Sequence, residues 1–457
     1  MSHLHQQQLS NVFSNLLEAQ QSKLSTSPQQ LDVEDCHYLL LFLLLGFSDS
    51  SSLHEDQAHA LFTQIVNSEI YDYIDGGFFS TSDYTKSLSI NTNFINLLTK
   101  ASGHFFEGNF SVPAINSAQW LIQHLQSETG AFFNRTQSDQ LSTDYYEMNF
   151  ELIRQSLDSD GFTAFSTAYA IKEKSNKIHR INSYQKVSEL TSMHIKQVPL
   201  ALESARQQLI IVRQNKTFPS IDQNVCCYDN GKIISTLFIA ARQFNRDSFS
   251  TAALYALKDI QLNHWDNEAK KTKHYLSLVN ALIMRLQYQW DDNDYHWLIE
   301  IGNHLVESTN ADNIIQAIET NPLDSTIDDL FNLYFLSFNE AFLRLANALA
   351  NKMYRYQDAS SIINICFLSS IMKSSSLQNF IVIRGSKYEA TYWQQQLNSG
   401  YKPYSHVYAI PKTDSKTLNT NFPITDKTQG TVYLFNNEQQ TKQPVLQSLD
   451  SLLDIYS

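Results

Sequence analysis

Apolar residues recur at intervals of three and four along most of the chain, which is the spacing of one face of an α-helix. The clearest such stripe consists of Leu276, Val279, Ile283, Leu286 and Trp290. Similar stripes cover residues 114–125, 237–244 and 253–260, and residues 330–350 and 360–372 are apolar on more than one face. The pattern predicts helices that follow one another in pairs, with the last two segments as inner helices.

The first part of the chain differs from the rest. Residues 1–30 are rich in Gln and Ser and only weakly periodic, which predicts a loosely docked helix. Residues 38–47 (YLLLFLLLGF) are strongly apolar, but ten residues fall short of the roughly 18 that span a bilayer, so we expect a buried core helix. No basic stretch followed by an apolar core marks a signal peptide, and we expect a cytoplasmic protein.

The last hundred residues follow a different pattern. Residues 380–384 (FIVIR) and 406–410 read as short strands on either side of a helical stretch, 387–397, which predicts a small βαβ unit. Residues 431–435 (TVYLF) are suited to a third strand. One glycine after the first strand, Gly385, is too little to indicate a nucleotide-binding turn.

Composition supports helices over alternating β architectures. The chain of 457 residues contains only 12 glycines, whereas average usage would give roughly 32. Few positions therefore need a positive φ angle or a tight turn. Repeated helix–loop–helix units suggest either a solenoid or a closed toroid, and because no signature of the common helical repeats is present, the toroid is favoured.

The net charge, the cysteines and the histidines argue against nucleic-acid binding, a disulfide framework and a metal site. A net charge of -13 opposes binding to nucleic acid, whose affinity comes from neutralisation of phosphates by Lys and Arg. Cys36, Cys226, Cys227 and Cys366 are too few and too scattered for a disulfide framework, which indicates reduced thiols. The 14 histidines contain no H-x-x-x-H spacing. We therefore expect no metal site and no cofactor.

Several motifs in one order resemble a known family. Residues 70–79 read IYDYIDGGFF, and residues 129–133 (TGAFF), 144–146 (DYY) and 219–222 (PSID) follow, with Asn230-Gly231 after them. This series is similar to motifs of the thioredoxin-domain-containing, spermatogenesis-associated-protein family, over roughly residues 35–450. Asn321-Pro322 and the βαβ segment with its Tyr401-Lys402-Pro403 also match in order.

The resemblance implies an (α/α)6 toroid, similar to six-hairpin glycosidases and N-acylglucosamine 2-epimerases, with a small C-terminal βαβ unit. It divides the chain into a polar N-terminal extension (1–34), the helical toroid (35–375) and a small α/β unit packed on it (376–457). The family's thioredoxin domain and its active-site cysteines have no counterpart here. Gly76 and Gly77 are expected at a sharp backbone turn between two helices.

The departures from the family fall on its acid/base residues. Asn93, Ile95 and Lys100 stand where the family has His, Glu and Asp, and only Asp139 is acidic within residues 136–139. Neither Asn nor Ile transfers a proton near neutral pH. Sugar chemistry needs a pair of titratable groups across the substrate, so these positions cannot perform it.

A smaller polar set remains that is expected to line the central cavity and bind a polar ligand such as a sugar. Its members are Tyr71, Asp72, Asp83, Tyr145, Tyr146, Asp222 and Asn230. The competing interpretation is that the Asp and Asn residues cap helices and the tyrosines pack the inner wall.

The main hypothesis is a non-catalytic toroid, a pseudoenzyme that acts as a binding or interaction protein. Its partner would be a sugar-like ligand or a protein, for example a thioredoxin-like protein that supplies the missing domain. The alternative hypothesis is a carbohydrate-active enzyme, epimerase-like or glycosidase-like, whose acids have moved to other positions.

Overall fold

The computed structural model describes most of the chain between residues 52 and 435. The described residues are 52–80, 84–105, 109–172, 175–265, 271–320, 323, 325–355, 379–398, 405–412, 421–423 and 431–435. The predicted helices at 38–47 and 360–372, the segment 1–30 and the two predicted domain boundaries lie outside these residues. The domain limits therefore stay a prediction.

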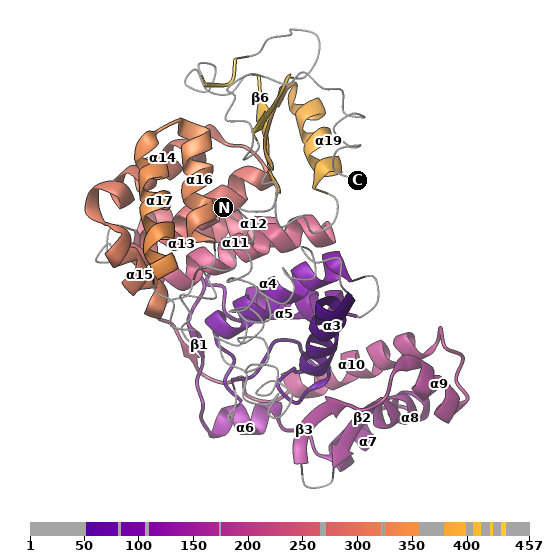
Figure 1. The fold of residues 1–457 in the computed structure, drawn as a ribbon. Helices are drawn as coiled ribbons and strands as arrows, with labels where there is room; N and C mark the ends of the chain where they lie inside the picture. Colours follow the sequence, from indigo (N-terminus) through magenta and orange to yellow (C-terminus); the bar gives the residue numbers. More distant parts are fainter. Residues whose placement is uncertain are drawn as a thin grey trace.

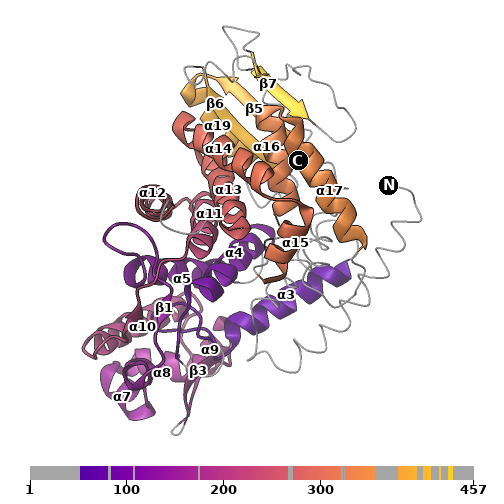
Figure 2. The ribbon, with the colours of Figure 1, turned by 90° about the vertical axis from the view of Figure 1, so that its left-hand side faces the viewer.

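The described chain is mainly helical and is built from antiparallel helix pairs (Figures 1 and 2), so the predicted fold class, a mainly α toroid of (α/α)6 type with a small C-terminal sheet, is confirmed. Four inner helices stand side by side, with α11 between α4 and α13 and with α16 beyond α13. They are α4 (Leu88–His104), α11 (Cys227–Phe244), α13 (Thr272–Tyr288) and α16 (Thr326–Ser337).

Each inner helix is followed along the chain by an outer helix that packs against it. The outer helices are α5 (Ser111–His124), α12 (Asp247–Asp259), α14 (Asp292–Ser308) and α17 (Glu340–Arg355). Three further elements complete this part: α3 (Ser52–Asn67) against α4, the π-helix η2 (Ile260–His264) after α12, and α15 (Ala311–Thr320) against α13 and α17. Within the described parts of the chain, no helix combines the length and the apolar character needed to cross a membrane.

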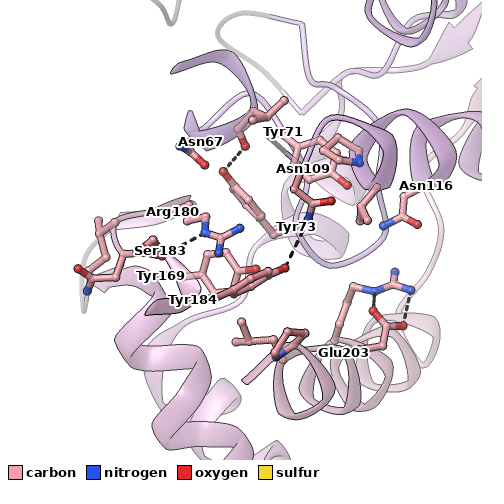
Figure 3. A pocket seen from close by; sticks show the side chains of 18 of the residues that line it. Asn67, Tyr71, Tyr73, Asn109, Asn116, Tyr169, Arg180, Ser183, Tyr184 and Glu203 are labelled. Carbon is pink, nitrogen blue, oxygen red and sulfur yellow. Dashed lines mark hydrogen bonds and ion pairs between the residues drawn. The ribbon is translucent and has the colours of Figure 1, made fainter. Parts of the chain in front are cut away.

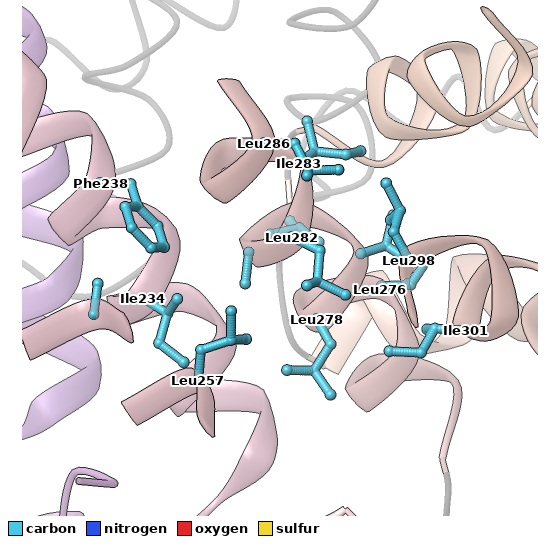
Figure 4. Packing of buried hydrophobic residues seen from close by; sticks show 14 of the residues in the cluster. Ile234, Phe238, Leu257, Leu276, Leu278, Leu282, Ile283, Leu286, Leu298 and Ile301 are labelled. Carbon is cyan, nitrogen blue, oxygen red and sulfur yellow. The ribbon is translucent and has the colours of Figure 1, made fainter. Parts of the chain in front are cut away.

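The inner helix α13 shows why the hydrophobic pattern led to this architecture. Its predicted stripe is buried, and Leu278 and Leu282 on the other side of the helix are buried as well (Figure 4). Partners on both sides enclose the helix, with Ile234 from α11 and Leu298 from α14 in the same cluster. Full burial of one Leu or Ile side chain contributes roughly 1.5–3 kcal/mol, so this cluster dominates the packing of the toroid.

One helix boundary was predicted wrongly. Residues 330–350 do not form a single helix, because α16 ends at Ser337 and α17 begins at Glu340. Phe338 between them has a φ of 55°, the left-handed conformation that ends a helix. Asn339 then accepts a hydrogen bond from Ala341 N (3.0 Å) at the start of the next helix. Hydrophobic periodicity continues through this break, so it gave no sign of the turn.

A group of short elements between the first two helix pairs was not predicted. It contains α6 (Gln140–Tyr146), α7 (Phe150–Ser156), α8 (Ser159–Ala168), β2 (Tyr169–Lys172), β3 (Ser175–Arg180), α9 (Tyr184–Thr191) and α10 (Val198–Gln214). Strands β2 and β3 form an antiparallel hairpin. This insert has its own core around Phe165 and Leu209. The short strands β1 (Arg135–Thr136) and β4 (Ile221–Asp222) pair at its base.

The C-terminal unit is the predicted βαβ unit with its third strand. Strands β5 (Asn379–Gly385) and β6 (Ser405–Pro411) are parallel, and α19 (Lys387–Leu397) connects them. Strand β7 (Thr431–Phe435) pairs with β5 in the antiparallel sense. The sheet packs on the toroid through β6, where Tyr408 donates a hydrogen bond to Asn332 Oδ1 of α16 (2.7 Å).

Candidate functional site

The loop between α3 and α4 positions the candidate site. Gly76 and Gly77 have φ angles of +85° and +82°, which confirms the expected sharp turn. A Cβ atom on Gly76 would lie 2.7 Å from the backbone oxygen of Asn116. The loop therefore approaches α5 so closely that only glycine fits at position 76. Gly77 N donates to Ser117 Oγ of α5 (3.1 Å). The glycines therefore hold residues 70–79 against α5.

Asp72, in this loop, is the centre of a buried charge cluster. Its Oδ2 atom lies 2.7 Å from Lys86 Nζ and 2.6 Å from a guanidinium nitrogen of Arg213 in α10. Burial alone would raise the pKa of Asp72, but the charges of Arg213 and Lys86 outweigh it and lower the pKa to about 2. Asp72 therefore remains ionised throughout the physiological pH range.

Lys86 is sealed inside the protein. Its Nζ atom also donates to Gly76 O (2.5 Å) and lies 4.9, 4.5 and 4.7 Å from the ring centres of Phe79, Trp120 and Tyr146. Burial lowers the pKa of Lys86 below its usual value, and the carboxylate of Asp72 opposes that shift. With no exposed surface, Lys86 cannot touch a ligand in this conformation. The cluster joins the loop to α10 and has a structural role.

Next to this cluster lies a cavity of about 360 Å³, here called the tyrosine pocket (Figure 3). Its walls come from α3, the loop of residues 70–79, the start of α5, the β2–β3 hairpin and α10. The polar and aromatic residues that line it are Thr63, Asn67, Tyr71, Tyr73, Asn109, Phe110, Asn116, Phe165, Tyr169, Arg180, Asn182, Ser183, Tyr184, Glu203 and Arg206. The unpredicted insert therefore builds half of the pocket.

The tyrosines form a connected wall in this pocket. The ring centres of Tyr71 and Tyr73 are 5.0 Å apart, and those of Tyr73 and Tyr169 are 4.8 Å apart. Tyr73 donates its hydroxyl to Val66 O (2.5 Å). Burial raises the pKa of each of these three tyrosines, so they keep their protons at neutral pH. The wall thus offers aromatic surface and neutral hydroxyl groups.

The charged groups of the tyrosine pocket are already engaged. Glu203 and Arg206 form two hydrogen bonds, of 2.8 and 2.9 Å, and Arg206 also donates to Ile74 O (3.0 Å). The guanidinium of Arg180 lies 4.2 Å above the ring centre of Tyr184 and donates to Asn182 O (3.1 Å). The groups that remain for a ligand are chiefly rings, hydroxyls and amides.

A second titratable pair joins the same loop to α5. Asp75 Oδ2 lies 3.5 Å from His124 Nε2 of α5, and both side chains keep some solvent exposure. Burial would raise the pKa of Asp75, but the neighbouring His124 and the charge of Lys86 outweigh it and lower the pKa. The His124 ring stacks on Phe218 at 4.6 Å. This pair is not among the residues that line the tyrosine pocket.

The structure distributes the predicted cavity residues over three places. Tyr71 lines the tyrosine pocket, and Asp72, Tyr145 and Tyr146 belong to the buried cluster around Arg213, whose guanidinium lies 5.8 and 5.3 Å from the two tyrosine rings. Asp83 lies outside the described residues. None of the described members caps a helix, contrary to the competing interpretation for the acidic residues and Asn230.

Asp222 and Asn230 lie elsewhere and support backbone. Asn230 accepts from Phe132 N (2.7 Å) and donates to Phe132 O (2.9 Å), so it holds the segment of residues 129–133 against α11. Asp222 accepts from Asn134 Nδ2 (2.9 Å) beside the β1–β4 pair. Both residues maintain a connection between chain segments about ninety to a hundred positions apart.

The positions of the missing acids lie on the inner helix α4 and its surroundings. Ile95 is fully buried in the main core, and Asn93 is buried close to it on the same helix. Asp139 accepts from Ser142 N (2.9 Å) and caps α6 at the surface. Among the residues that the structure describes, no three His, Cys, Asp or Glu side chains converge as a metal site would require.

Comparison with known proteins gave matches among solved structures alone. No protein-family model and no curated protein matches this chain. A cellobiose 2-epimerase from Bacillus thermoamylovorans B4167 is 10% identical, and the match covers 74% of this chain and 86% of the epimerase at a TM-score of 0.42. A D-mannose isomerase is 12% identical over 69% of this chain and 97% of its own, at a TM-score of 0.29. Because the sequence identity and the TM-score are both low, neither match indicates what this chain binds or which reaction it catalyses.

Proposed function

We propose that this protein binds a neutral, hydroxyl-rich ligand of the sugar type in the tyrosine pocket, without transforming it. The observation that carries the proposal is the lining itself, with four tyrosines and four asparagines around a cavity of about 360 Å³. That volume lies at the small end of the range for ligand pockets, roughly 300–1,000 Å³.

The pocket chemistry suits an uncharged ligand. Aromatic rings bury the apolar faces of a ligand, whereas amides and hydroxyls both donate and accept hydrogen bonds from its hydroxyl groups. Because Glu203 is paired with Arg206, a charged ligand would find no free counterion in that pair. An unpaired charge would be costly to place there.

The proposal of binding without catalysis rests on the same lining. Acid/base chemistry on a sugar needs two titratable groups on opposite sides of the reacting atoms. Among the described residues that line the pocket, Glu203 is the one carboxylate and there is no histidine. The single carboxylate is held by Arg206 and does not face a second acid.

Calorimetric titration with a panel of neutral mono- and disaccharides tests this proposal. We expect saturable binding of at least one sugar, weakened about tenfold or more by Tyr184→Ala or Asn109→Ala, because each removes a contact from the wall. The matched control is Tyr388→Ala, since Tyr388 is 85% exposed on α19, far from the pocket walls. Absence of binding by every sugar, or equal losses in control and pocket variants, would refute the proposal.

A carbohydrate-active enzyme is the second candidate, and the Asp75–His124 pair favours it. A histidine oriented by a carboxylate is a competent general base, and Asp75 of this pair lies on the loop that also carries Tyr71 and Tyr73. In this case the protein would convert a sugar in the titration panel, and His124→Gln would abolish conversion with little effect on affinity. Unchanged sugars after prolonged incubation, followed by NMR, would eliminate this candidate.

The idea of a thioredoxin-like protein partner stays a prediction. Affinity purification from the native cell addresses it directly. Recovery of a thioredoxin-fold protein in stoichiometric amount would support the partner, and its absence from repeated purifications would count against it.

A further inference from the structure

A second, larger cavity lies between the toroid and the C-terminal unit. It has a volume of about 550 Å³, is open to solvent on one side, and is bounded by the C-terminal ends of α11 and α13 and by α19, which Figure 1 shows above α11 and α12. We call it the α19 cavity. Its lining residues are Ala241, Arg242, Gln243, Asn245, Asp247, Gln287, Tyr288, Gln289, Lys387, Thr391, Gln394, Gln395 and Asn398. None of them lines the tyrosine pocket.

The lining of the α19 cavity is unusually polar for a junction between two packed units. Five glutamines and two asparagines contribute amides, and apolar surface comes from Ala241 and the ring of Tyr288. A junction that served only to join two units would bury apolar side chains, because that is where stabilisation arises. The amides therefore indicate a cavity that holds polar contents.

The wall formed by α19 is held in place by hydrogen bonds. Gln394 Nε2 donates to Gln287 O of α13 (2.7 Å) and to Val407 O of β6 (2.9 Å). Gln287 in turn donates to the hydroxyl of Tyr408 (3.3 Å). Two walls of the cavity are thus connected by buried bonds, so its shape is set before any ligand enters.

Arg242 supplies the charge in this cavity. Its guanidinium is accessible from the cavity, and it has no hydrogen-bond or ion-pair partner among the described residues. The side chain of Arg242 is exposed to solvent, so it carries its charge at neutral pH. Lys387 adds a second cation to the lining, and Asp247 is the one carboxylate among the described lining residues.

The position of Arg242 in the last turn of α11 offers a simpler explanation, because a helix C-terminus attracts cations. That attraction accounts for a basic residue at the helix end. It does not account for the cavity beside it, for the amides that also line the cavity, or for a guanidinium that makes no bond to the terminal carbonyls.

We propose that the α19 cavity binds a small molecule that carries an oxyanion, either a phosphate or a carboxylate. The planar guanidinium of Arg242 forms two parallel hydrogen bonds with such a group, and Lys387 adds positive charge. The amides of Gln289 and Gln395, which also line the cavity, then bind the remaining polar atoms of the ligand. This site is separate from the proposed sugar pocket and does not depend on it.

Calorimetric titration of the full chain with inorganic phosphate and, separately, with acetate tests the proposal, with sodium chloride at matched ionic strength as the reference. We expect saturable one-to-one binding of at least one of the two anions. The anion that binds with the higher affinity identifies the chemistry of the natural ligand. Arg242→Gln should weaken binding about tenfold or more, as expected for a lost charge-assisted hydrogen bond. Tyr184→Ala in the tyrosine pocket should leave anion binding unchanged.

The matched control is Arg246→Gln, which removes the same charge from an exposed position four residues further on. It should bind phosphate as the unmodified protein does. Because Arg242 has no hydrogen-bond or ion-pair partner to lose among the described residues, Arg242→Gln should also fold, with a urea midpoint close to that of the unmodified protein in anion-free buffer. Failure of both anions to bind, equal losses in the two variants, or unfolding of Arg242→Gln would each overturn the proposal.

Discussion

The ammonium group of Lys86 lies 2.7 Å from a carboxylate oxygen of Asp72, and the protein seals both groups from solvent. Asp72 at the same time pairs with Arg213 at 2.6 Å. One carboxylate therefore neutralises two cations that come from different parts of the fold. This arrangement makes Asp72 more important for stability than either of its partners.

Replacing Asp72 by Asn should destabilise the protein by about 3–5 kcal/mol, because it leaves two buried cations without their counterion. Lys86→Met should cost less, since Arg213 still pairs with Asp72 and the methionine side chain fills the ring cage. Urea unfolding measures both differences. Glu189→Gln is the control, because it breaks an exposed ion pair with Lys186 and should change stability by under about 0.5 kcal/mol. A smaller loss for Asp72→Asn than for Lys86→Met would contradict this order.

Stability should fall in acid through the same residue. The pKa of Asp72 is lowered from 3.8 to about 2 in the folded protein, so its stabilising contribution is complete above pH 4 and is lost as the pH falls towards 2. A shift of this size corresponds to about 2 kcal/mol. The free energy of unfolding, measured in urea between pH 6 and pH 3, should decrease less steeply in Asp72→Asn than in the unmodified protein. Parallel curves would show that another group controls the acid transition.

The turn at Gly76 should tolerate no side chain. Gly76→Ala places a methyl group 2.7 Å from the Asn116 backbone oxygen at a φ of +85°, so we expect a loss of about 2–4 kcal/mol. Gly77→Ala should cost less, because its nearest contacts, with side-chain atoms of Asn91 and Lys86, are at 3.2 Å and not at 2.7 Å. Thermal unfolding of the two variants compares them. Equal losses would mean that backbone conformation alone, and not the contact with α5, decides the cost.

Much of the architecture follows from local patterns in the sequence. The stripe from Leu276 to Trp290 identified α13, and two short β-like runs around a helical segment identified the C-terminal unit. Helices and strands depend on backbone hydrogen bonds and on side-chain spacing within a few residues, so a short segment of the sequence is enough to predict them. The break at Phe338 was missed because the apolar spacing continues across it, and a left-handed Phe has no signature of its own.

The candidate sites depended on contacts that no local pattern reveals. Lys86 and Arg213 were not predicted, and no spacing links Asp72 to an arginine 141 positions away. Arg180, Tyr169 and Arg206 come from an insert that the hydrophobic pattern did not identify, and nothing in the local sequence distinguishes Arg242 from other basic residues near a helix end.

The sequence by itself determined the helix pairs, the C-terminal βαβ unit and the turn at Gly76 and Gly77, because backbone hydrogen bonding, amphipathic spacing and the steric freedom of glycine act over short distances along the chain. Tertiary structure alone decided that Asp72 would be buried between two cations, that Tyr71 would join an aromatic wall, and that Arg242 would face an amide-lined cavity. Ion pairs, burial and cavities depend on which distant segments meet, and that is settled only when the helices pack together.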